Sequence, residues 1–457
     1  MKTIHPSLTN DVLLAWYADD FTGAAAVMEV LEFSGIPSML FLQPPTSDQL
    51  KRYPKLRAVG VASTARTKSP QWMDEHLPSI FKQLHELDPA LIHYKICTTL
   101  DSSPEIGSIG RVIEIGSDLF HPQMVSVLVA APQMGRYQYF GHLFARSGDK
   151  TYRLDRHPVM SRHPVTPMTE SDVAIHIGNQ SKRLDIDYVP LNFSAQNQQF
   201  QPPRAGKIKT LTFDCTDEIS ESLIGEFIWA KRHENPFIVG SQGVEYALVQ
   251  HWRDTGALPT AEPHLGIGKA KNIVAISGSV SPTTAEQIAW SKDNGFASIS
   301  FDATSVFRGQ TAIDTEIEHC INCAFDALSN NLDPLIHTAE GPDDPAVGKF
   351  RTALAESSLG MSQASEIIGQ SLGIILQRIL SQSGIRRAIV SGGDTSGYAT
   401  HQLGIFALSA LAPTIAGAAI CKAHAEGEMD GLELALKGGQ MGSKDYFGWI
   451  RDGGGAR

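Results

Sequence analysis

Short apolar segments alternate with longer helical patterns along most of this sequence, and that alternation restricts the fold more than any other feature. Segment 11–16 (DVLLAW) is predicted to be a buried strand, 22–35 a helix that ends at Gly35, and 37–42 the next strand. Strands joined by helices indicate an α/β fold whose sheet is mostly parallel and flanked by helices. The same pattern predicts strands at 56–63, 91–96, 124–131, 187–191, 207–213 and 236–241, and a helix near 70–87.

The alternation stops at residues 253–271, which show no periodicity and are rich in glycine and proline. Such a segment is typical of a domain boundary. We therefore expect two domains, residues 1–255 and 256–457, each with a mostly parallel sheet flanked by helices. In the second domain the pattern predicts strands at 272–279, 297–301, 334–339, 387–392 and 432–437, and helices at 282–294 and 362–384.

The overall charge and the N-terminal residues limit the partners and the location. The formal net charge of -11 argues against nucleic acid and acidic membrane surfaces as partners, because both require a basic face. No apolar run approaches the roughly 20 residues that span a bilayer, and the first residues lack the apolar core of a signal peptide. A cytoplasmic location is the expectation that follows.

The five cysteines include a C-x-x-C pair, Cys320 and Cys323. This spacing is found in redox pairs and in zinc sites. No second C-x-x-C completes a tetrahedral zinc site, so the favoured interpretation is two helical cysteines one turn apart.

Two adjacent carboxylates, Asp19 and Asp20, directly follow the first predicted strand. Ligands of open α/β sheets bind at the carboxyl ends of strands, and neighbouring carboxylates are costly to ionise together. One of them is a candidate catalytic base for phosphoryl transfer, accepting the proton of a substrate hydroxyl. The alternative is a helix cap, in which Asp20 or Thr22 accepts hydrogen bonds from the first helical N–H groups.

Two further polar segments follow strands in the first domain. The turn after 91–96 offers hydroxyls and backbone N–H groups to a carboxylate or hydroxylated ligand. Arg136 follows the strand at 124–131, where a guanidinium can grip a carboxylate. An ordinary polar turn and a surface arginine are the alternatives. The candidate substrate-binding residues are Thr99, Asp101, Ser102, Ser103 and Arg136.

Glycine-rich turns follow three strands of the second domain. Backbone N–H groups in such turns can cradle phosphate at a helix N-terminus, although plain helix caps have the same composition. Asp394 is a candidate to hold Mg²⁺ or its water shell; no residue is assigned as a direct metal ligand. The candidate nucleotide-binding residues are Ser277, Ser279, Gly392, Gly393, Asp394, Thr395, Ser396 and Gly438.

In this order, the segments YADDFTGAAA, FIVGSQGVEYAL, SGSVSPTTAEQI, SGGDTSG and LKGGQMG resemble the four-carbon acid sugar kinase family, the tetronate kinases. The resemblance covers nearly the whole chain. It implies an N-terminal substrate domain, a C-terminal ATP domain, and Mg-ATP-dependent phosphorylation of a sugar-acid hydroxyl in carbohydrate catabolism. Asp19, Asp20, the 99–103 turn and Arg136 would then face the substrate, and the glycine turns would face ATP. The expected partners are a small sugar acid and a second copy of the chain as a homodimer.

One segment departs from the family pattern. Typical members carry Asp-Ser-Thr-Leu-Arg-Gly where this chain has residues 97–102, so an acid is replaced by Cys97 and a base by Asp101. A carboxylate at that place would disfavour an anionic group and favour hydroxyls. The departure indicates a divergent branch, similar to the kinases of 3-oxo-isoapionate, a branched oxo sugar acid.

Two other functional classes remain as alternatives. The same fold can serve a non-catalytic sensor of nucleotides or sugar acids, since fold does not determine function. An NAD-dependent dehydrogenase is disfavoured, because Asp19 and Asp20 stand where its G-x-G-x-x-G fingerprint would be.

Overall fold

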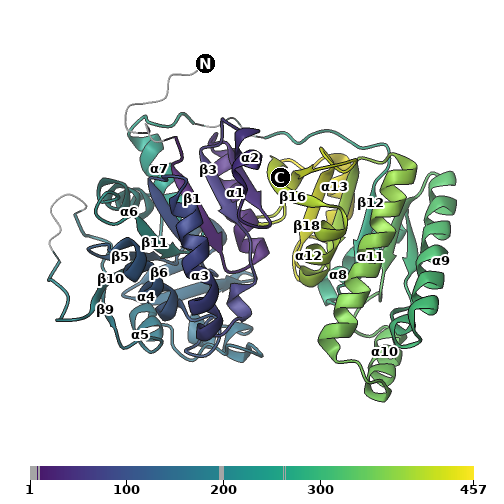
Figure 1. Cartoon of the computed structure of the whole chain (residues 1–457), viewed down its shortest axis with the longest axis horizontal. Helices are drawn as coiled ribbons and strands as arrows, with labels where there is room; N and C mark the ends of the chain where they lie inside the picture. Colours follow the sequence, from purple (N-terminus) through teal and green to yellow (C-terminus); the bar gives the residue numbers. More distant parts are fainter. Residues whose placement is uncertain (1–7, 9–10, 195–199, 261, 263) are drawn as a thin grey trace. The chain divides into compact units, whose positions relative to one another are not determined.

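The chain forms two compact units, Met1–Glu262 and Pro263–Arg457, in a computed structural model (Figure 1). The structure describes residue 8 and residues 11–194, 200–260, 262 and 264–457; of Asp394 it describes the backbone alone. Within the described residues, no helix is long and apolar enough to cross a membrane.

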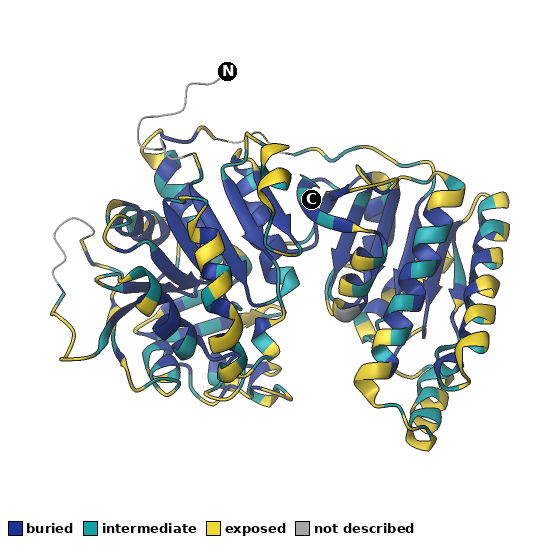
Figure 2. Ribbon diagram, viewed as in Figure 1, coloured by how far each residue is buried: buried dark blue, intermediate teal, exposed yellow. Residues whose placement is uncertain are grey.

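The first unit contains a parallel sheet with strands in the order β2-β3-β1-β4-β11-β5-β10-β9. The central strands are buried on both faces, as near-continuous apolar segments require. Figure 2 shows these strands in the colour of buried residues. The strands are β1 (Leu14–Ala18), β2 (Ser38–Phe41), β3 (Ala58–Val61), β4 (Leu91–Lys95), β5 (Val125–Leu128), β9 (Leu184–Val189), β10 (Ile208–Phe213) and β11 (Phe237–Gly240).

Helices cover both faces of this sheet. Helices α3 and α4 pack with β1, β4 and β11 in one apolar core, while α6 and α7 pack together and α7 contacts α1. The helices are α1 (Phe21–Phe33), α2 (Ser47–Lys51), α3 (Pro70–His85), α4 (Ile109–Phe120), α5 (Val173–Gly178), α6 (Glu218–Ala230) and α7 (Gly243–Asp254).

The passage from β1 into α1 is the local feature that positions the acidic pair. Asp20 caps α1 by accepting a hydrogen bond from the Gly23 N–H at 2.9 Å, which satisfies one of the free donors of the first turn. The helix ends before Gly35, whose φ of +89° suits glycine. Asp19 and Asp20 therefore lie at the carboxyl end of β1.

A small antiparallel sheet in the first unit was not predicted. Its strands are β6 (Arg136–Tyr139), β7 (His142–Ser147) and β8 (Lys150–Arg153), paired in that order. The strands are short and rich in polar residues, and therefore lack the apolar runs that mark the strands of the main sheet.

The second unit has its own sheet, in the order β13-β14-β12-β15-β18-β17-β16. The first five strands of that order are parallel, whereas β17 runs antiparallel to both β18 and β16. The strands are β12 (Val274–Ser277), β13 (Phe296–Ser300), β14 (Asp333–His337), β15 (Arg387–Ser391), β16 (Ile405–Ala412), β17 (Ile420–Ala425) and β18 (Glu433–Lys437).

Helices α8 and α13 share an apolar core with one face of this sheet, and α11 packs against α9, α12 and β12. The α/β class with mostly parallel sheets is thus confirmed, with β16 and β17 as the antiparallel addition. The helices are α8 (Pro282–Lys292), α9 (Gln310–Ser329), α10 (Pro345–Glu356), α11 (Met361–Ser383), α12 (Gly393–Gln402) and α13 (Tyr446–Asp452).

Cys320 and Cys323 both lie on α9 as free thiols, one turn apart. Among the described residues, no three His, Cys, Asp or Glu side chains gather as a metal site. The helical interpretation of the C-x-x-C pair is confirmed.

Candidate active site

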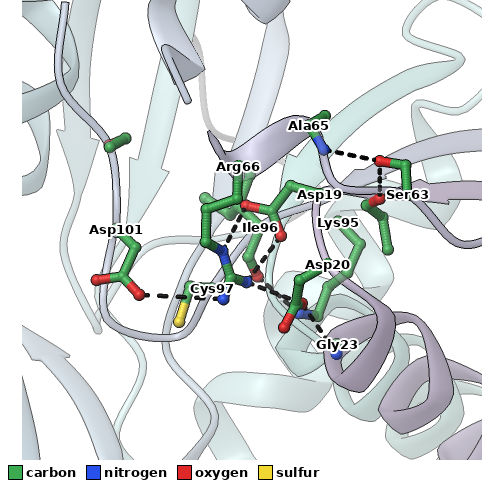
Figure 3. Close-up of polar contacts among 12 residues, drawn as sticks. Asp19, Asp20, Gly23, Ser63, Ala65, Arg66, Lys95, Ile96, Cys97 and Asp101 are labelled. Carbon is green, nitrogen blue, oxygen red and sulfur yellow. Dashed lines mark hydrogen bonds and ion pairs between the residues drawn. The ribbon is translucent and has the colours of Figure 1, made fainter. Parts of the chain in front are cut away.

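Three neighbouring strands of the first unit end in polar segments that meet. Asp19 and Asp20 follow β1, Arg66 lies in a short 3₁₀ turn after β3, and Cys97 and Asp101 lie in the turn after β4. Because β1 pairs with both β3 and β4 in parallel, the three carboxyl ends are adjacent. Figure 3 shows Arg66 between the two aspartates of the β1 end and Asp101.

Arg66 is the centre of this cluster. Its Nη2 lies 2.8 Å from Asp19 Oδ1 and 2.8 Å from Asp20 Oδ1, and its Nε lies 3.3 Å from Asp19 Oδ2. Its Nη1 lies 4.0 Å from Asp101 Oδ2. Burial works against the charged guanidinium, but the surrounding acids, led by Asp19, raise the pKa of Arg66 well above its ordinary value. Arg66 is therefore a fixed positive charge that holds three carboxylates together.

The two adjacent carboxylates differ in access. The Asp19 side chain is 5% exposed, and burial raises its pKa, although Arg66 opposes this effect. The Asp20 side chain is 28% exposed. Its Oδ1 contacts Arg66 and the Gly23 N–H, while its Oδ2 has no partner among the residues that the structure describes. Asp20 thus offers the free oxygen that a proton acceptor needs, and Asp19 serves to orient Arg66.

The replaced family positions, Cys97 and Asp101, lie on the other side of Arg66. Cys97 Sγ is 3.0 Å from Thr99 Oγ1, and burial raises the pKa of the thiol, which therefore stays protonated. Burial also raises the pKa of Asp101, against the effect of Arg66. Its Oδ1 is buried and has no hydrogen-bond partner within the part of the chain that the structure describes. Arg66 was not singled out in the sequence, yet it brings a cation to the place where the family's arginine is missing.

The serines of the 97–103 turn are engaged within the protein. Ser102 Oγ donates to the Leu100 carbonyl at 2.8 Å and lies 2.9 Å from His176 Nε2, and Ser103 Oγ accepts from the Ile106 N–H at 3.0 Å. These bonds define the shape of the turn that carries Asp101. Contact of either hydroxyl with a substrate stays a prediction.

Arg136 begins β6 and is not part of the Arg66 cluster. Its Nη1 donates to the carbonyl oxygens of Met134 at 3.1 Å and Gly135 at 3.3 Å. Burial lowers its pKa, and no carboxylate of the described residues lies within 4.0 Å of it. Its charge is therefore not neutralised by an ion pair, which leaves it suited to an anionic group.

Gly23 leaves space beside it for the side chains of Asp20 and Lys95. A Cβ at position 23 would lie 2.4 Å from Asp20 Oδ1 and 2.5 Å from Lys95 Nζ. Lys95 is buried and donates to the Ile96 carbonyl at 2.7 Å. Both atoms thus occupy the place that a side chain would fill.

We expect Gly23→Ala to lower turnover about 100-fold, because the added methyl displaces the carboxylate of Asp20, the candidate proton acceptor. Stability should change by less than about 1 kcal/mol, since alanine favours the helix. Steady-state kinetics and thermal melting measure the two effects. Gly348→Ala is the matched control, an exposed position on α10 with open space around it; wild-type turnover in Gly23→Ala would contradict the expected displacement.

In the second unit, three glycine-containing turns converge at the carboxyl ends of β12, β15 and β18. These strands are neighbours, and Ser277, Ser391 and Lys437 lie side by side as their last residues. A Cβ at Gly278 would lie 2.2 Å from Thr395 Oγ1, and one at Gly439 would lie 2.3 Å from Ser279 Oγ. The close approach of the turns therefore depends on glycine.

Hydroxyl groups fasten these turns to each other. Thr284 Oγ1 donates to the Gly439 carbonyl at 3.0 Å and contacts Ser279 Oγ at 3.0 Å, and Ser281 Oγ donates to the same carbonyl at 2.5 Å. Ser277 Oγ is buried and accepts from the Ser279 N–H at 3.3 Å. The N-terminus of α8, which is the positive end of the helix dipole, opens at this place and suits phosphate.

The turn after β15 is shorter than expected. Gly392 alone, with a φ of +125°, forms the turn, and Gly393 already begins α12. Thr395 and Ser396 lie in the first helical turn, where Ser396 Oγ donates to the Gly392 carbonyl at 2.7 Å. The polar, glycine-rich composition of this segment predicted a longer loop. A first helical turn at a ligand site has the same composition, so composition alone does not distinguish the two. The side chain of Asp394, the candidate for Mg²⁺, lies outside the described residues.

Lys437 is the buried cation of this region. Its side chain is 2% exposed, and its Nζ donates to the Gly438 carbonyl at 3.2 Å. No other acceptor among the described residues contacts it, although an ammonium has three donors. Burial lowers its pKa to about 8. The sequence marked Gly438 in this turn and gave Lys437 no separate role.

Comparison with known proteins agrees with one candidate site in each unit. Residues 14–248 match the family model described as a sugar-binding N-terminal domain, and residues 274–447 match the one described as a nucleotide-binding C-terminal domain. Fold and sites define a two-domain protein with separate sugar and nucleotide modules. The chain belongs to the four-carbon acid sugar kinase family.

Individual relatives extend over the full length. The 3-oxo-isoapionate kinase of Paraburkholderia graminis is 39% identical, covering 97% of this chain and 94% of that protein. The 3-oxo-tetronate kinase of Cupriavidus necator is 26% identical, covering 96% and 97%. A crystal structure from Salmonella typhimurium LT2 superposes with a TM-score of 0.75 at 23% identity, covering 96% of this chain and 98% of that one, which shows the shared fold.

Proposed function

We propose that this protein is a kinase that transfers the γ-phosphoryl group of ATP to a hydroxyl of a small oxo sugar acid, of the 3-oxo-isoapionate or 3-oxo-tetronate type. The accessible carboxylate of Asp20, at the carboxyl end of β1 and oriented by Arg66, carries the proposal. The full-length similarity to kinases named for those two sugar acids supports the substrate class.

The reaction assigns one role to each group of the sugar-binding unit. The substrate hydroxyl gives its proton to Asp20 Oδ2 as its oxygen bonds to the γ-phosphorus, and the bond from that phosphorus to the β–γ bridging oxygen breaks to release ADP. Asp19 is a positioning residue, because it reaches the reaction only through Arg66. Asp101 is proposed to accept hydrogen bonds from other hydroxyls of the substrate, and Thr99 to donate to them. Arg136 is proposed to face the carboxylate of the acid.

The nucleotide-binding unit is proposed to hold ATP by its phosphates. The glycine turns allow backbone N–H groups close to phosphate oxygens, and the underpaired ammonium of Lys437 fits an anion beside them. Mg²⁺, when bound with ATP, neutralises phosphate charge. The proposed contacts are Ser277, Ser279, Gly392, Gly393, Thr395, Ser396 and Gly438, with Asp394 toward the Mg²⁺ water shell.

A coupled assay of ADP release, run with ATP and a panel of four- and five-carbon sugar acids and their oxo forms, tests the proposal. We expect release that depends on one sugar acid, with the phosphorylated acid seen by mass spectrometry. Thermal shifts without phosphorylation would instead indicate a sensor. The cytoplasmic location and the homodimer stay predictions; light scattering of the purified protein tests the second.

A further inference from the structure

Gln180, which follows α5, fastens the turn that carries Asp101 to the N-terminus of α4. Its Oε1 accepts from the N–H groups of Ile109 at 2.7 Å and Gly110 at 3.2 Å, the first residues of that helix. Its Nε2 donates to Ser102 Oγ at 2.8 Å. One amide group thus joins the turn after β4 to the free donors of the first turn of α4.

The orientation of this amide follows from its contacts. A backbone N–H group only donates, so the atom that faces Ile109 and Gly110 is the oxygen, and the NH₂ group faces Ser102. A Cβ at Gly110 would lie 2.9 Å from the carbonyl carbon of Gln180, so the helix also lies against the backbone of this residue. A reversed amide would lose both bonds to α4.

The bond to Ser102 acts on the peptide group that precedes Asp101. Ser102 Oγ donates its one proton to the Leu100 carbonyl at 2.8 Å. That carbonyl belongs to the planar peptide unit shared by Leu100 and Asp101, so the bond fixes the plane from which Asp101 projects. Leu100 has a φ of +55°, a left-handed conformation that is unfavourable for a residue with a side chain. The turn therefore depends on partners outside itself to keep its shape.

His176, on α5, completes this network. Its Nε2 lies 2.9 Å from Ser102 Oγ and 3.1 Å from Gln180 Nε2. Burial lowers the pKa of His176 to about 4, although the Leu100 carbonyl and Glu170 favour the charged ring. The ring is therefore neutral at pH 7, and the neutral NH₂ group beside it adds no charge that would protonate it.

We propose that Gln180 is a positioning residue of the sugar-acid site, which sets the orientation of Asp101 through Ser102 and thereby determines how tightly the substrate hydroxyls bind. The polar atoms of the Gln180 side chain are engaged within the protein, so it acts on the substrate only through the turn. The inference rests on the proposed function for the identity of the ligand that Asp101 contacts.

Gln180→Glu separates the two ends of this bridge. One carboxylate oxygen can still accept from the N–H groups of α4, whose N-terminus favours a negative charge, but the donor to Ser102 is lost. The Ser102 proton then turns from the Leu100 carbonyl to the new carboxylate, and the peptide before Asp101 loses its anchor. We expect KM for the sugar acid to rise about tenfold, with kcat and KM for ATP within about threefold of the wild type.

The titration of His176 gives a readout that a general loss of stability would not produce. The new carboxylate of Gln180→Glu faces His176 Nε2 where the amide nitrogen was, so it stabilises the charged ring. The pKa of His176, measured by NMR, should therefore rise from about 4 to about 5 or higher. In Gln180→Met, which has neither donor nor charge, KM for the sugar acid should rise as well, whereas the pKa of His176 should stay low.

Gln83→Glu is the matched control, because Gln83 is an exposed glutamine on α3 that likewise donates to a serine, Ser79, at 3.4 Å. It should leave both KM values and the pKa of His176 unchanged. The proposal would be overturned by wild-type KM for the sugar acid in both Gln180 variants, by KM values for ATP and the sugar acid that rise together, or by an unchanged pKa of His176 in Gln180→Glu.

An inactive wild type would contradict the kinase function alone. The affinity for the sugar acid, measured by calorimetry in the wild type and the Gln180 variants, would then take the place of KM. Weaker binding in the variants together with the raised pKa of His176 would still support the role of Gln180, and equal binding would overturn it.

Discussion

Asp20→Asn is expected to lower kcat by about 10²–10⁴-fold, the usual contribution of a general base, while ATP binds with wild-type affinity. The amide keeps an oxygen that can cap α1 through the Gly23 N–H, but it cannot take up the hydroxyl proton. The nucleotide turns lie in the other unit, so their affinity should not change. Steady-state kinetics and calorimetric titration with ATP measure the two quantities.

Asp48→Asn is the matched control for this substitution. Asp48 lies on α2, is exposed, and among the described residues pairs only with Lys51 at 2.9 Å, so its loss should leave turnover unchanged. If Asp20→Asn turned over like the wild type, Asp20 would not be the base. If Asp20→Asn lost ATP affinity as well, the substitution would have disturbed the structure as a whole and not only the proton transfer.

Lys437→Met is expected to make the protein more stable and less active at once. Burial of the charged ammonium costs about 3.5 kcal/mol at most, from a pKa that falls from 10.5 to about 8. Methionine removes this cost, so the melting temperature at pH 7 should rise. It also removes the cation proposed to meet a phosphate, so ATP affinity and turnover should each fall at least about tenfold.

The pH dependence of the stability change in Lys437→Met distinguishes a charge effect from an effect of packing. Between the folded pKa of about 8 and the ordinary value of 10.5, the unfolded chain binds the proton that the folded chain has lost. The free energy of unfolding contributed by Lys437 therefore rises with pH across that window. The stability advantage of Lys437→Met should be fully present below pH 8 and disappear as the pH approaches 10.5.

Lys422→Met, at an exposed position of β17, is the control and should change neither stability nor activity appreciably. A lower melting temperature of Lys437→Met at pH 7 would show that the ammonium is stabilised within the free protein. Unchanged ATP affinity would remove Lys437 from the nucleotide site.

The α/β class and the position of Asp19 and Asp20 could be predicted because apolar strands and the residues that follow them are local features of the sequence. Arg66 could not, because its role depends on β3 lying beside β1, and strand order is not encoded in local periodicity. The sequence contained one indication of Arg66: polar residues directly follow predicted strands at the candidate site, and the segment after 56–63 is also polar.

Other features of the structure also depend on contacts between residues that are distant in the sequence. The family's missing arginine at position 101 suggested a place without a cation, yet Arg66 reaches it from another strand. Lys437 stands next to two glycines in the sequence, and its burial follows from the packing of β18 and not from that local pattern. The β6–β8 sheet escaped prediction because its short polar strands carry no apolar pattern.

The most direct test of the central claim is a single-turnover assay with γ-³²P-labelled ATP and 3-oxo-isoapionate or a 3-oxo-tetronate. Wild-type protein should transfer the label to the sugar acid, and Asp20→Asn should bind the same ATP and transfer almost none. Bound ATP with no labelled product from any four- or five-carbon sugar acid would contradict the kinase function.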